Sequence, residues 1–210
     1  MKVSVVGLGK VGSSLAFVLA IKNFVHELVL VGRTRESVLG DVLDLRHGQL
    51  FVDAPTRIVA GTLEDTAGSD IIALCASTPT PRDMHSRLQL APANVALLRE
   101  LLPDLARLSP QCKIVIVSNP VDVLVHFALQ ITGFKPNQIM GTGTLVDSAR
   151  FRQLLAEEIQ IHQEDIRAYI LGEHGDSQFP AMSCADAGSV PIDPTPARYQ
   201  LFEQASHAGF

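Results

Sequence analysis

The chain has 210 residues, of which 47% are hydrophobic and 19% charged, and its formal net charge is −5. This composition is typical of a globular protein with a sizeable core, and the acidic balance argues against a surface built to bind nucleic acid. Residues 11–21 form the longest apolar run near the start, which is too short to span a membrane.

The three cysteines, Cys75, Cys112 and Cys184, are far apart in the sequence. An odd number without short spacing argues against a disulfide framework and against a zinc site. Glycines interrupt the apolar segment where a signal peptide would need a continuous core. We therefore expect free thiols, no bound metal and a cytoplasmic protein.

The first segment has the pattern of a dinucleotide-binding turn. Residues 2–6 predict a buried strand, residues 13–21 predict a helix, and GLGKVG lies between them at 7–12. In such a turn, Gly7 permits the tight bend, Gly9 lets a pyrophosphate approach the backbone, and Gly12 lets helix and strand pack closely. The helix N-terminus would supply N–H donors for phosphate. The alternative is a tight strand-to-helix turn that binds no ligand.

Residues 27–31 predict the second strand, after which dinucleotide-binding proteins usually carry an acid for the ribose 2′-hydroxyl. Position 32 is instead a glycine, followed by Arg33, Thr34 and Arg35. Loss of the carboxylate and gain of two cations suit a 2′-phosphate, which favours NADP slightly over NAD. Alternatively, both arginines are solvated and NAD binds without its usual anchor.

Strand-like and helix-like segments continue to alternate up to residue 141. Six strands with intervening helices predict a doubly wound parallel (Rossmann) sheet of the α/β class, over residues 1–143. We predict the remaining helices at 36–47, at 88–108 with a break near Pro103, and at 121–132, and the remaining strands at 57–60, 70–75, 113–117 and 138–141.

Polar residues follow the carboxyl ends of two predicted strands, where doubly wound sheets bind ligands. Residues 76–87 contain Arg82 and Arg87 and could close over a site as a lid, or could be a surface loop with solvated arginines. Asn119 follows the next strand and either binds a substrate oxygen or is a turn residue before proline.

A second domain is expected over residues 144–210, as a partial α+β substrate domain. Its helix, 145–160, carries Asp147 and Arg150 three positions apart and so on one face. A strand at 166–171 leads into the loop that holds His174, and a further helix begins at Ala197. An imidazole exchanges protons near neutral pH, a carboxylate beside it stabilises the imidazolium, and a guanidinium grips a carboxylate through two hydrogen bonds. With a nicotinamide cofactor, these groups suit oxidation of a hydroxy acid to an oxo acid.

Four motifs occur in order: GLGKVG at 7–12, VSNPVDVL at 117–124, GTGTLVDSARFR at 141–152 and GEHGDS at 172–177. With them the whole chain resembles the L-lactate/malate dehydrogenase family. The resemblance implies an NAD(P)-dependent L-2-hydroxyacid dehydrogenase in which His174 is the catalytic acid/base and Asp147 its partner. Arg150 would bind the substrate carboxylate, Asn119 the substrate oxygen, and Arg87 would polarise the carbonyl.

The resemblance also implies a 2-oxo acid substrate, a homodimer or homotetramer, and further residues of the substrate domain beyond Phe210. We expect these cofactor-binding positions: Gly7, Leu8, Gly9, Lys10, Val11, Gly12, Gly32, Arg33, Thr34, Arg35, Ala76, Ser77, Asn94, Val117 and Asn119.

The choice of substrate depends on the lid. Family members select a dicarboxylate with an arginine at a fixed distance before the catalytic arginine; here Arg82 precedes Arg87 by five positions, without the usual glycine-containing spacing. Arg82 would favour oxaloacetate if it pointed inward. The motifs around Asp147 and His174 are more similar to the lactate branch, so we favour lactate and pyruvate over malate and oxaloacetate.

Two other functions are compatible with a dinucleotide-binding fold. A non-catalytic dinucleotide-binding protein on the same fold would have little reason to keep Asp147, Arg150 and His174 together. An NAD-dependent glycosidase on a related fold would need a metal site of cysteine and histidine, and no such pairing follows Asn119.

Overall fold

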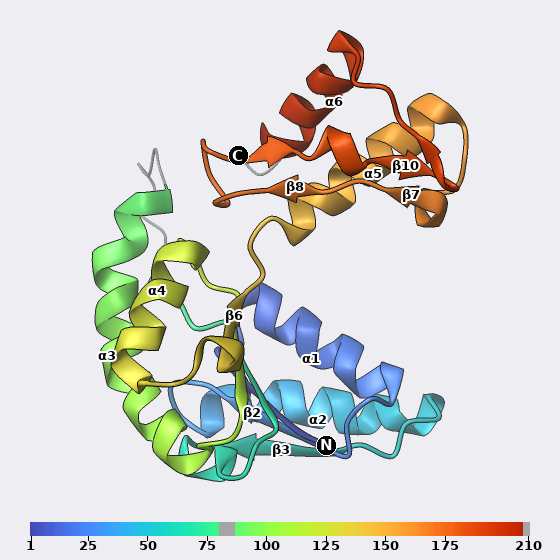
Figure 1. The fold of residues 1–210 in the computed structure, drawn as a ribbon. Helices are drawn as coiled ribbons and strands as arrows, with labels where there is room; N and C mark the ends of the chain where they lie inside the picture. Colours follow the sequence, from blue (N-terminus) through green and yellow to red (C-terminus); the bar gives the residue numbers. More distant parts are fainter. Residues whose placement is uncertain (80–86, 208–210) are drawn as a thin grey trace. The chain divides into compact units, whose positions relative to one another are not determined.

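The computed structural model describes residues 1–79 and 87–207, and it divides into two compact units, Met1–Gly141 and Thr142–Phe210 (Figure 1). The boundary falls two residues before the predicted end of the cofactor domain at 143. The roles predicted for the two ranges stay predictions. Within the described residues, no helix is both long and apolar enough to cross a membrane.

The first unit contains one six-stranded sheet, which confirms the predicted doubly wound arrangement. All its strands run parallel, in the order β3-β2-β1-β4-β5-β6. The order reverses between β1 and β4, and ligands of doubly wound sheets bind at such a switch point. The strands are β1 (Lys2–Val6), β2 (Glu27–Val31), β3 (Arg57–Gly61), β4 (Ile71–Leu74), β5 (Lys113–Ile116) and β6 (Ile139–Gly141).

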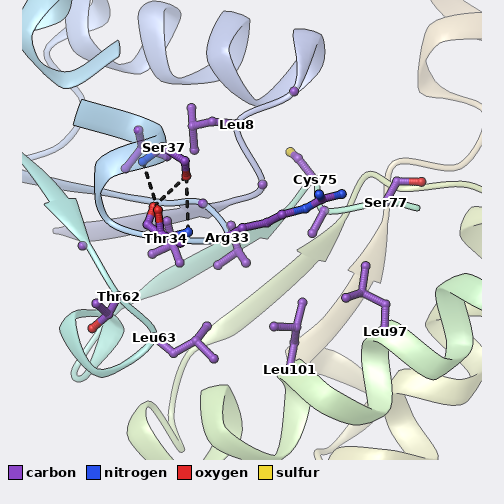
Figure 2. Close-up of a pocket in the computed structure, with 18 of the residues that line it drawn as sticks. Leu8, Arg33, Thr34, Ser37, Thr62, Leu63, Cys75, Ser77, Leu97 and Leu101 are labelled. Carbon is purple, nitrogen blue, oxygen red and sulfur yellow. Dashed lines mark hydrogen bonds between the residues drawn. The ribbon is translucent and has the colours of Figure 1, made fainter. Parts of the chain in front are cut away.

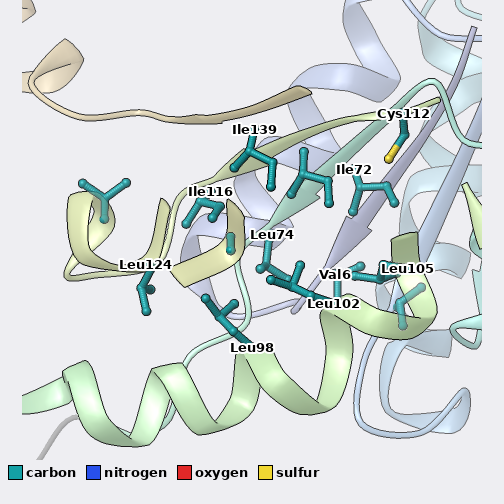
Figure 3. Close-up of a cluster of buried hydrophobic side chains, with 14 of the residues drawn as sticks. Val6, Ile72, Leu74, Leu98, Leu102, Leu105, Cys112, Ile116, Leu124 and Ile139 are labelled. Atoms are coloured by element: carbon teal, nitrogen blue, oxygen red, sulfur yellow. The ribbon is translucent and has the colours of Figure 1, made fainter. Parts of the chain in front are cut away.

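Helices cover both faces of this sheet, because successive strand residues point to opposite faces and both sets are apolar. In β2, Leu28 and Leu30 pack with helices α1 (Lys10–Lys22) and α2 (Leu39–Gly48). The alternate residues Val29 and Val31 belong to the second core, shown in Figure 3. That core is completed by α3 (Ala91–Leu108) and α4 (Val121–Thr132). Short 3₁₀ helices are η1 (Glu36–Val38), η2 (Gln49–Phe51), η3 (Glu64–Thr66), η4 (Arg87–Leu90) and η5 (Pro136–Gln138).

The predicted break at Pro103 is wrong. The helix α3 continues through Pro103, which lies inside it. Proline is disfavoured in the interior of a helix, because it has no N–H to donate to the helical hydrogen-bond pattern. Leu102 and Leu105, on either side of it, are fully buried in the core, and this packing stabilises the continuous helix.

The second unit packs small antiparallel β-sheets against two helices, as the predicted α+β class requires. Helices α5 (Leu145–Ile159) and α6 (Pro196–His207) share a core with the strands, in which the rings of Phe151 and Phe202 meet edge to face. The remaining elements are η6 (Gln163–Asp165), β7 (Ile166–Arg167), β8 (Ile170–Leu171), β9 (Phe179–Pro180), η7 (Met182–Cys184), β10 (Asp186–Ala187) and β11 (Val190–Pro191).

The single strand predicted at 166–171 is wrong in one respect. The chain forms two short strands there, because it changes partner between Arg167 and Ile170. Strand β7 pairs with β10, whereas β8 pairs with β9. The loop 172–178 therefore connects the two strands of a hairpin, β8 and β9.

Candidate cofactor cavity and catalytic residues

A cavity of about 740 Å³ lies in the first unit, where residues that end or follow β1, β2, β3 and β4 meet. Figure 2 shows its labelled side chains, with Leu63, Leu97 and Leu101 forming an apolar wall. Nine of the predicted cofactor-binding residues line it: Gly7, Leu8, Gly9, Gly32, Arg33, Thr34, Arg35, Ala76 and Ser77. Its volume is within the range of small-molecule sites.

The three glycines of the turn have three different environments. Gly7 has a φ of +98°, and a Cβ there would collide with the backbone of Ala76. A Cβ at Gly12 would collide with the carbonyl oxygen of Gly7. At Gly9, by contrast, a Cβ would meet nothing within 4 Å. The fold itself therefore needs glycine at 7 and 12, while Gly9 leaves open space beside the cavity.

The N-terminus of α1 fits a phosphate group. No side chain caps it at Gly9, and its first turn contains no acidic residue. The first N–H groups of a helix lack intrahelical partners and carry a partial positive charge. With the open space at Gly9, they form a cradle of the kind that binds the pyrophosphate of a dinucleotide.

The segment after β2 replaces the usual acid with hydroxyls and arginines. A Cβ at Gly32 would come too close to the side chains of Ser37 and Val38, so an aspartate there would require both of them to shift. The Ser37 hydroxyl donates to the Thr34 carbonyl at 2.6 Å, and the Ser37 N–H donates to the Thr34 hydroxyl at 3.3 Å. Arg33 extends into the cavity (Figure 2).

One carboxylate lines the described part of the cavity. The Thr62 hydroxyl donates to Glu64 at 2.7 Å and, together with a backbone hydrogen bond, lowers the pKa of Glu64. Glu64 is therefore ionised at neutral pH. Sequence reasoning missed Thr62 and Glu64, although both follow the carboxyl end of a strand, β3. It missed Leu63, Leu97 and Leu101 because they resemble ordinary core residues.

Six predicted cofactor residues do not line the cavity: Lys10, Val11, Gly12, Asn94, Val117 and Asn119. Lys10 and Val11 are exposed in the first turn of α1, and Gly12 is buried by its contact with Gly7. Asn94 is 1% exposed, and its side chain is occupied by hydrogen bonds inside the protein. Val117 and Asn119 follow β5.

The second unit brings Asp147, Arg150 and His174 together. The Asp147 side chain is fully buried, and its Oδ2 lies 2.7 Å from Nδ1 of His174. Its Oδ1 lies 3.4 Å from Nη1 of Arg150. The Arg150 side chain is 33% exposed and that of His174 is 16% exposed. A buried carboxylate thus contacts two groups that are each partly open to solvent.

Local hydrogen bonds hold this geometry. The N–H of Ile170, in β8, donates to the Ser148 hydroxyl at 2.9 Å, and the Thr144 hydroxyl donates to the Ile170 carbonyl at 2.6 Å. Both hydroxyls belong to the start of α5, next to Asp147. Gly172 then turns the chain with a φ of +97°, a conformation that favours glycine. The hairpin is thereby fixed to the helix that carries Asp147.

The remaining predicted site residues either lie in the first unit or fall outside the residues that the structure describes. Asn119 follows β5, and its carbonyl accepts a hydrogen bond from Asn94 at 2.7 Å. Arg82 lies outside the described residues. Arg87 is the first residue of η4, and its side chain is outside the description. Among the described residues, no three histidine, cysteine, aspartate or glutamate side chains gather as a metal site.

Sequence comparison assigns both units. The model for the lactate/malate dehydrogenase NAD binding domain matches residues 1–141, and that for the lactate/malate dehydrogenase alpha/beta C-terminal domain matches residues 144–208. The chain belongs to the lactate/malate dehydrogenase family. This confirms the resemblance deduced from the four motifs.

Curated relatives carry the name L-lactate dehydrogenase. That of Gloeobacter violaceus is 38% identical over 221 residues, covering 100% of this chain and 66% of that protein. The L-lactate dehydrogenase of a Synechococcus strain is also 38% identical, and the alignment covers 100% of this chain and 70% of that protein. The L-lactate dehydrogenase A chain of Gallus gallus is 38% identical and covers 91% and 57%. The chain therefore spans between 57% and 70% of these three relatives.

Solved structures of the family have the same fold. A minor L-lactate dehydrogenase from Enterococcus mundtii, in a ligand-bound form, superposes with a TM-score of 0.92 at 29% identity, covering 99% of this chain and 68% of that one. A lactate dehydrogenase enzyme from a Medee basin deep-sea metagenome gives 0.91 at 30% identity with the same coverage.

Proposed function

We propose that this chain carries the cofactor site and the acid/base residues of an L-2-hydroxyacid dehydrogenase that interconverts L-lactate and pyruvate. The observation that carries the proposal is the 2.7 Å contact between buried Asp147 and His174. The names of the relatives support lactate as the substrate. The open turn at Gly9 and the cavity beside it support a nicotinamide dinucleotide.

Asp147, Arg150 and His174, the catalytic trio proposed here, have different roles. Asp147 occupies Nδ1 of His174, so Nε2 exchanges the proton with the substrate oxygen. The buried carboxylate also fixes the imidazole tautomer and stabilises the imidazolium that forms when lactate is oxidised. Arg150 binds the substrate carboxylate, since a guanidinium offers donors in a planar fork. When bound in the cavity, a nicotinamide dinucleotide would supply hydride transfer to or from the substrate carbon.

Replacement of His174 tests the reaction type. We expect His174→Asn to lower kcat for pyruvate reduction roughly 10²- to 10⁴-fold, the usual contribution of general acid–base catalysis. Cofactor affinity should be unchanged, because the described residues that line the cavity all belong to the first unit. The matched control is His162→Asn, since the His162 side chain is 68% exposed. Cofactor binding without any turnover by the unmodified protein would favour a non-catalytic dinucleotide-binding protein instead.

We also propose roles for three residues outside the second unit: Arg82, Arg87 and Asn119. Arg87 polarises the substrate carbonyl and Asn119 binds its oxygen, as the family resemblance implies. Arg82 decides between pyruvate and oxaloacetate. Steady-state rates with both oxo acids test this choice: a higher kcat/KM with oxaloacetate would replace lactate by malate as the substrate.

For the cofactor we propose NADP over NAD. Gly32 puts no carboxylate at the end of β2, where it would repel a 2′-phosphate, and Arg33 lines the cavity beside it. A fluorescence titration should give a lower Kd for NADPH than for NADH, and Arg33→Gln combined with Arg35→Gln should remove the difference. Glu64→Gln is the control, because it removes a charge of opposite sign from the same cavity. A lower Kd for NADH in the unmodified protein would contradict the proposal.

The family resemblance also supports a homodimer or homotetramer in the cytoplasm. Light scattering of the purified protein after gel filtration tests the assembly, and a monomer at micromolar concentration would contradict it.

A further inference from the structure

The buried side chain of Asn94 joins two loops of the first unit. It lies on α3 and is 1% exposed. Its Oδ1 accepts hydrogen bonds from the N–H of Thr78 at 2.8 Å and from the Thr78 hydroxyl at 2.9 Å. Its Nδ2 donates to the Ser77 hydroxyl at 3.1 Å and to the Asn119 carbonyl at 2.7 Å. Both donors and the acceptor of the amide are therefore in use.

The two loops follow neighbouring strands. Ser77 and Thr78 come after β4 and line the cofactor cavity, whereas Asn119 comes after β5. Because β4 and β5 pair in parallel, their carboxyl ends lie at the same edge of the sheet. A second bond ties the same loops, since the Ser118 hydroxyl donates to the Ala76 carbonyl at 2.6 Å. Asn94 itself does not line the cavity.

We infer that Asn94 is a positioning residue that holds the cavity loop 76–78 and Asn119 in one geometry, so that cofactor and substrate meet correctly. This inference rests on the proposed function. A buried amide suits the task, because it carries donors and an acceptor without a net charge that would need a partner. An apolar side chain would leave the Thr78 N–H and the Asn119 carbonyl without this partner.

Asn94 makes two connections: the first is to the loop 76–78, through Ser77 and Thr78, and the second is to the Asn119 carbonyl. Three variants distinguish them. Asn94→Asp keeps an acceptor for Thr78 but replaces Nδ2, which donates to both Ser77 and Asn119, with an oxygen. The Ser77 hydroxyl can turn and donate to that oxygen, whereas the Asn119 carbonyl cannot, so the connection to Asn119 is the one that is lost. Asn94→Leu removes both connections. Thr78→Val is the matched control, because it removes one hydroxyl from the first connection and leaves the bond to Asn119 intact.

Backbone hydrogen exchange tests the connections without reference to catalysis. Asn94→Asp should speed exchange in residues 117–121 and leave 75–78 at the unmodified rate. Asn94→Leu should speed both segments, and Thr78→Val should leave 117–121 unchanged. An unchanged rate in 117–121 for Asn94→Asp would overturn the inference. This measurement keeps its meaning even if the protein reduces no oxo acid, a result that would refute only the proposed function.

Kinetics then test the consequence for the reaction. Asn94→Asp should raise KM for pyruvate about tenfold, the change expected from losing one buried hydrogen bond, with cofactor Kd unchanged. Asn94→Leu should weaken cofactor and pyruvate alike. A merely structural role predicts another pattern, in which the variants lower the thermal midpoint and kcat together while KM and Kd stay constant. That pattern would overturn the inference.

Discussion

Asp147 shows how one buried charge is accommodated. A fully buried carboxylate is stable only with partners, because loss of hydration disfavours the charged form. Here each oxygen faces a different nitrogen group, one on His174 and one on Arg150. The carboxylate therefore orients the imidazole and keeps the guanidinium beside it. Removing its charge should affect both groups at once.

Neutralising Asp147 should lower activity more than neutralising another aspartate nearby. We expect Asp147→Asn to reduce kcat strongly, because an amide can present its N–H₂ to Nδ1 and so favours the wrong imidazole tautomer. Asp176→Asn removes the same charge from an exposed position of the hairpin loop and should leave kcat unchanged. Equal kcat values in the two variants would contradict the proposed pairing. The thermal midpoint of each variant controls for loss of fold.

The cysteines should differ in reactivity, and the difference should depend on pH. Burial raises the pKa of the Cys75 and Cys112 thiols to about 11, whereas Cys184 is exposed. The thiolate is the reactive form, so at pH 8 only roughly one in a thousand of the thiols at Cys75 and Cys112 is reactive. Alkylation at pH 8 should modify Cys184 first, and that of Cys75 should accelerate as the pH rises toward 11.

Mass spectrometry of peptides, with urea-unfolded protein as the control, measures these rates. Cys75 lines the cofactor cavity, so added cofactor should slow its alkylation further. Alkylation of Cys75 at pH 8 as fast as that of Cys184 would contradict the burial of this thiol.

Residue types and spacing predicted Asp147, Arg150 and His174 as a group, but they did not predict the hydrogen bonds that hold the surrounding loops in place. Asp147 and Arg150 share a helix face by their spacing, and His174 follows in a glycine-rich loop, so all three could be named from the sequence. Asn94 was assigned to the cofactor site, yet its partners lie in two distant loops that only the fold brings together. The polar character of Asn94 could be read from the sequence, but its partners could not.

At the level of elements, the connection of α5 to the β8–β9 hairpin determines where His174 lies. The Ser148 hydroxyl accepts from the Ile170 N–H at 2.9 Å and lies 3.3 Å from the Ile170 carbonyl. Strand β8 contains only two residues and pairs with a strand of equal length. So short a hairpin is marginal by itself, and the bond to the helix stabilises it.

Ser148→Ala should therefore destabilise the second unit by about 1–3 kcal/mol, the cost of a buried donor without a partner. Because β8 leads into the loop of His174, kcat should fall as well. Urea unfolding measures the first effect. Ser206→Ala is the control: its hydroxyl donates to the Phe202 carbonyl within α6, so the stability change should be within about 0.5 kcal/mol. An equal effect of both substitutions would contradict the role of Ser148.

Element prediction succeeded where apolar periodicity was continuous. All six parallel strands were found, since a sheet buried on both faces needs uninterrupted apolar runs. The errors have tertiary causes: core packing carries α3 through Pro103, and the stretch 166–171 divides because its two halves pair with different strands. Neither cause is visible in a local window of sequence.

At the scale of the whole molecule, the described chain has separate cores for its two units. Two apolar clusters lie in the first unit and one in the second. Every described residue that lines the cofactor cavity falls between Val6 and Leu101. A compact unit with its own core can fold alone. The first unit should therefore retain cofactor binding by itself, whereas the proposed turnover would also require Asp147 and His174.

A fragment of residues 1–141 tests this division. It should unfold cooperatively and bind NADPH or NADH within tenfold of the affinity of the whole chain, a difference of at most about 1.4 kcal/mol. Gly9→Val in the fragment provides the control for site-specific binding. A side chain there meets no protein atom within 4 Å, and the φ of −78° suits any residue. The variant should keep the thermal midpoint but lose binding, because valine fills the space beside the helix N-terminus. If the fragment folds and binds neither cofactor, the dinucleotide site requires the second unit; if Gly9→Val binds normally, the dinucleotide does not approach the backbone at this turn.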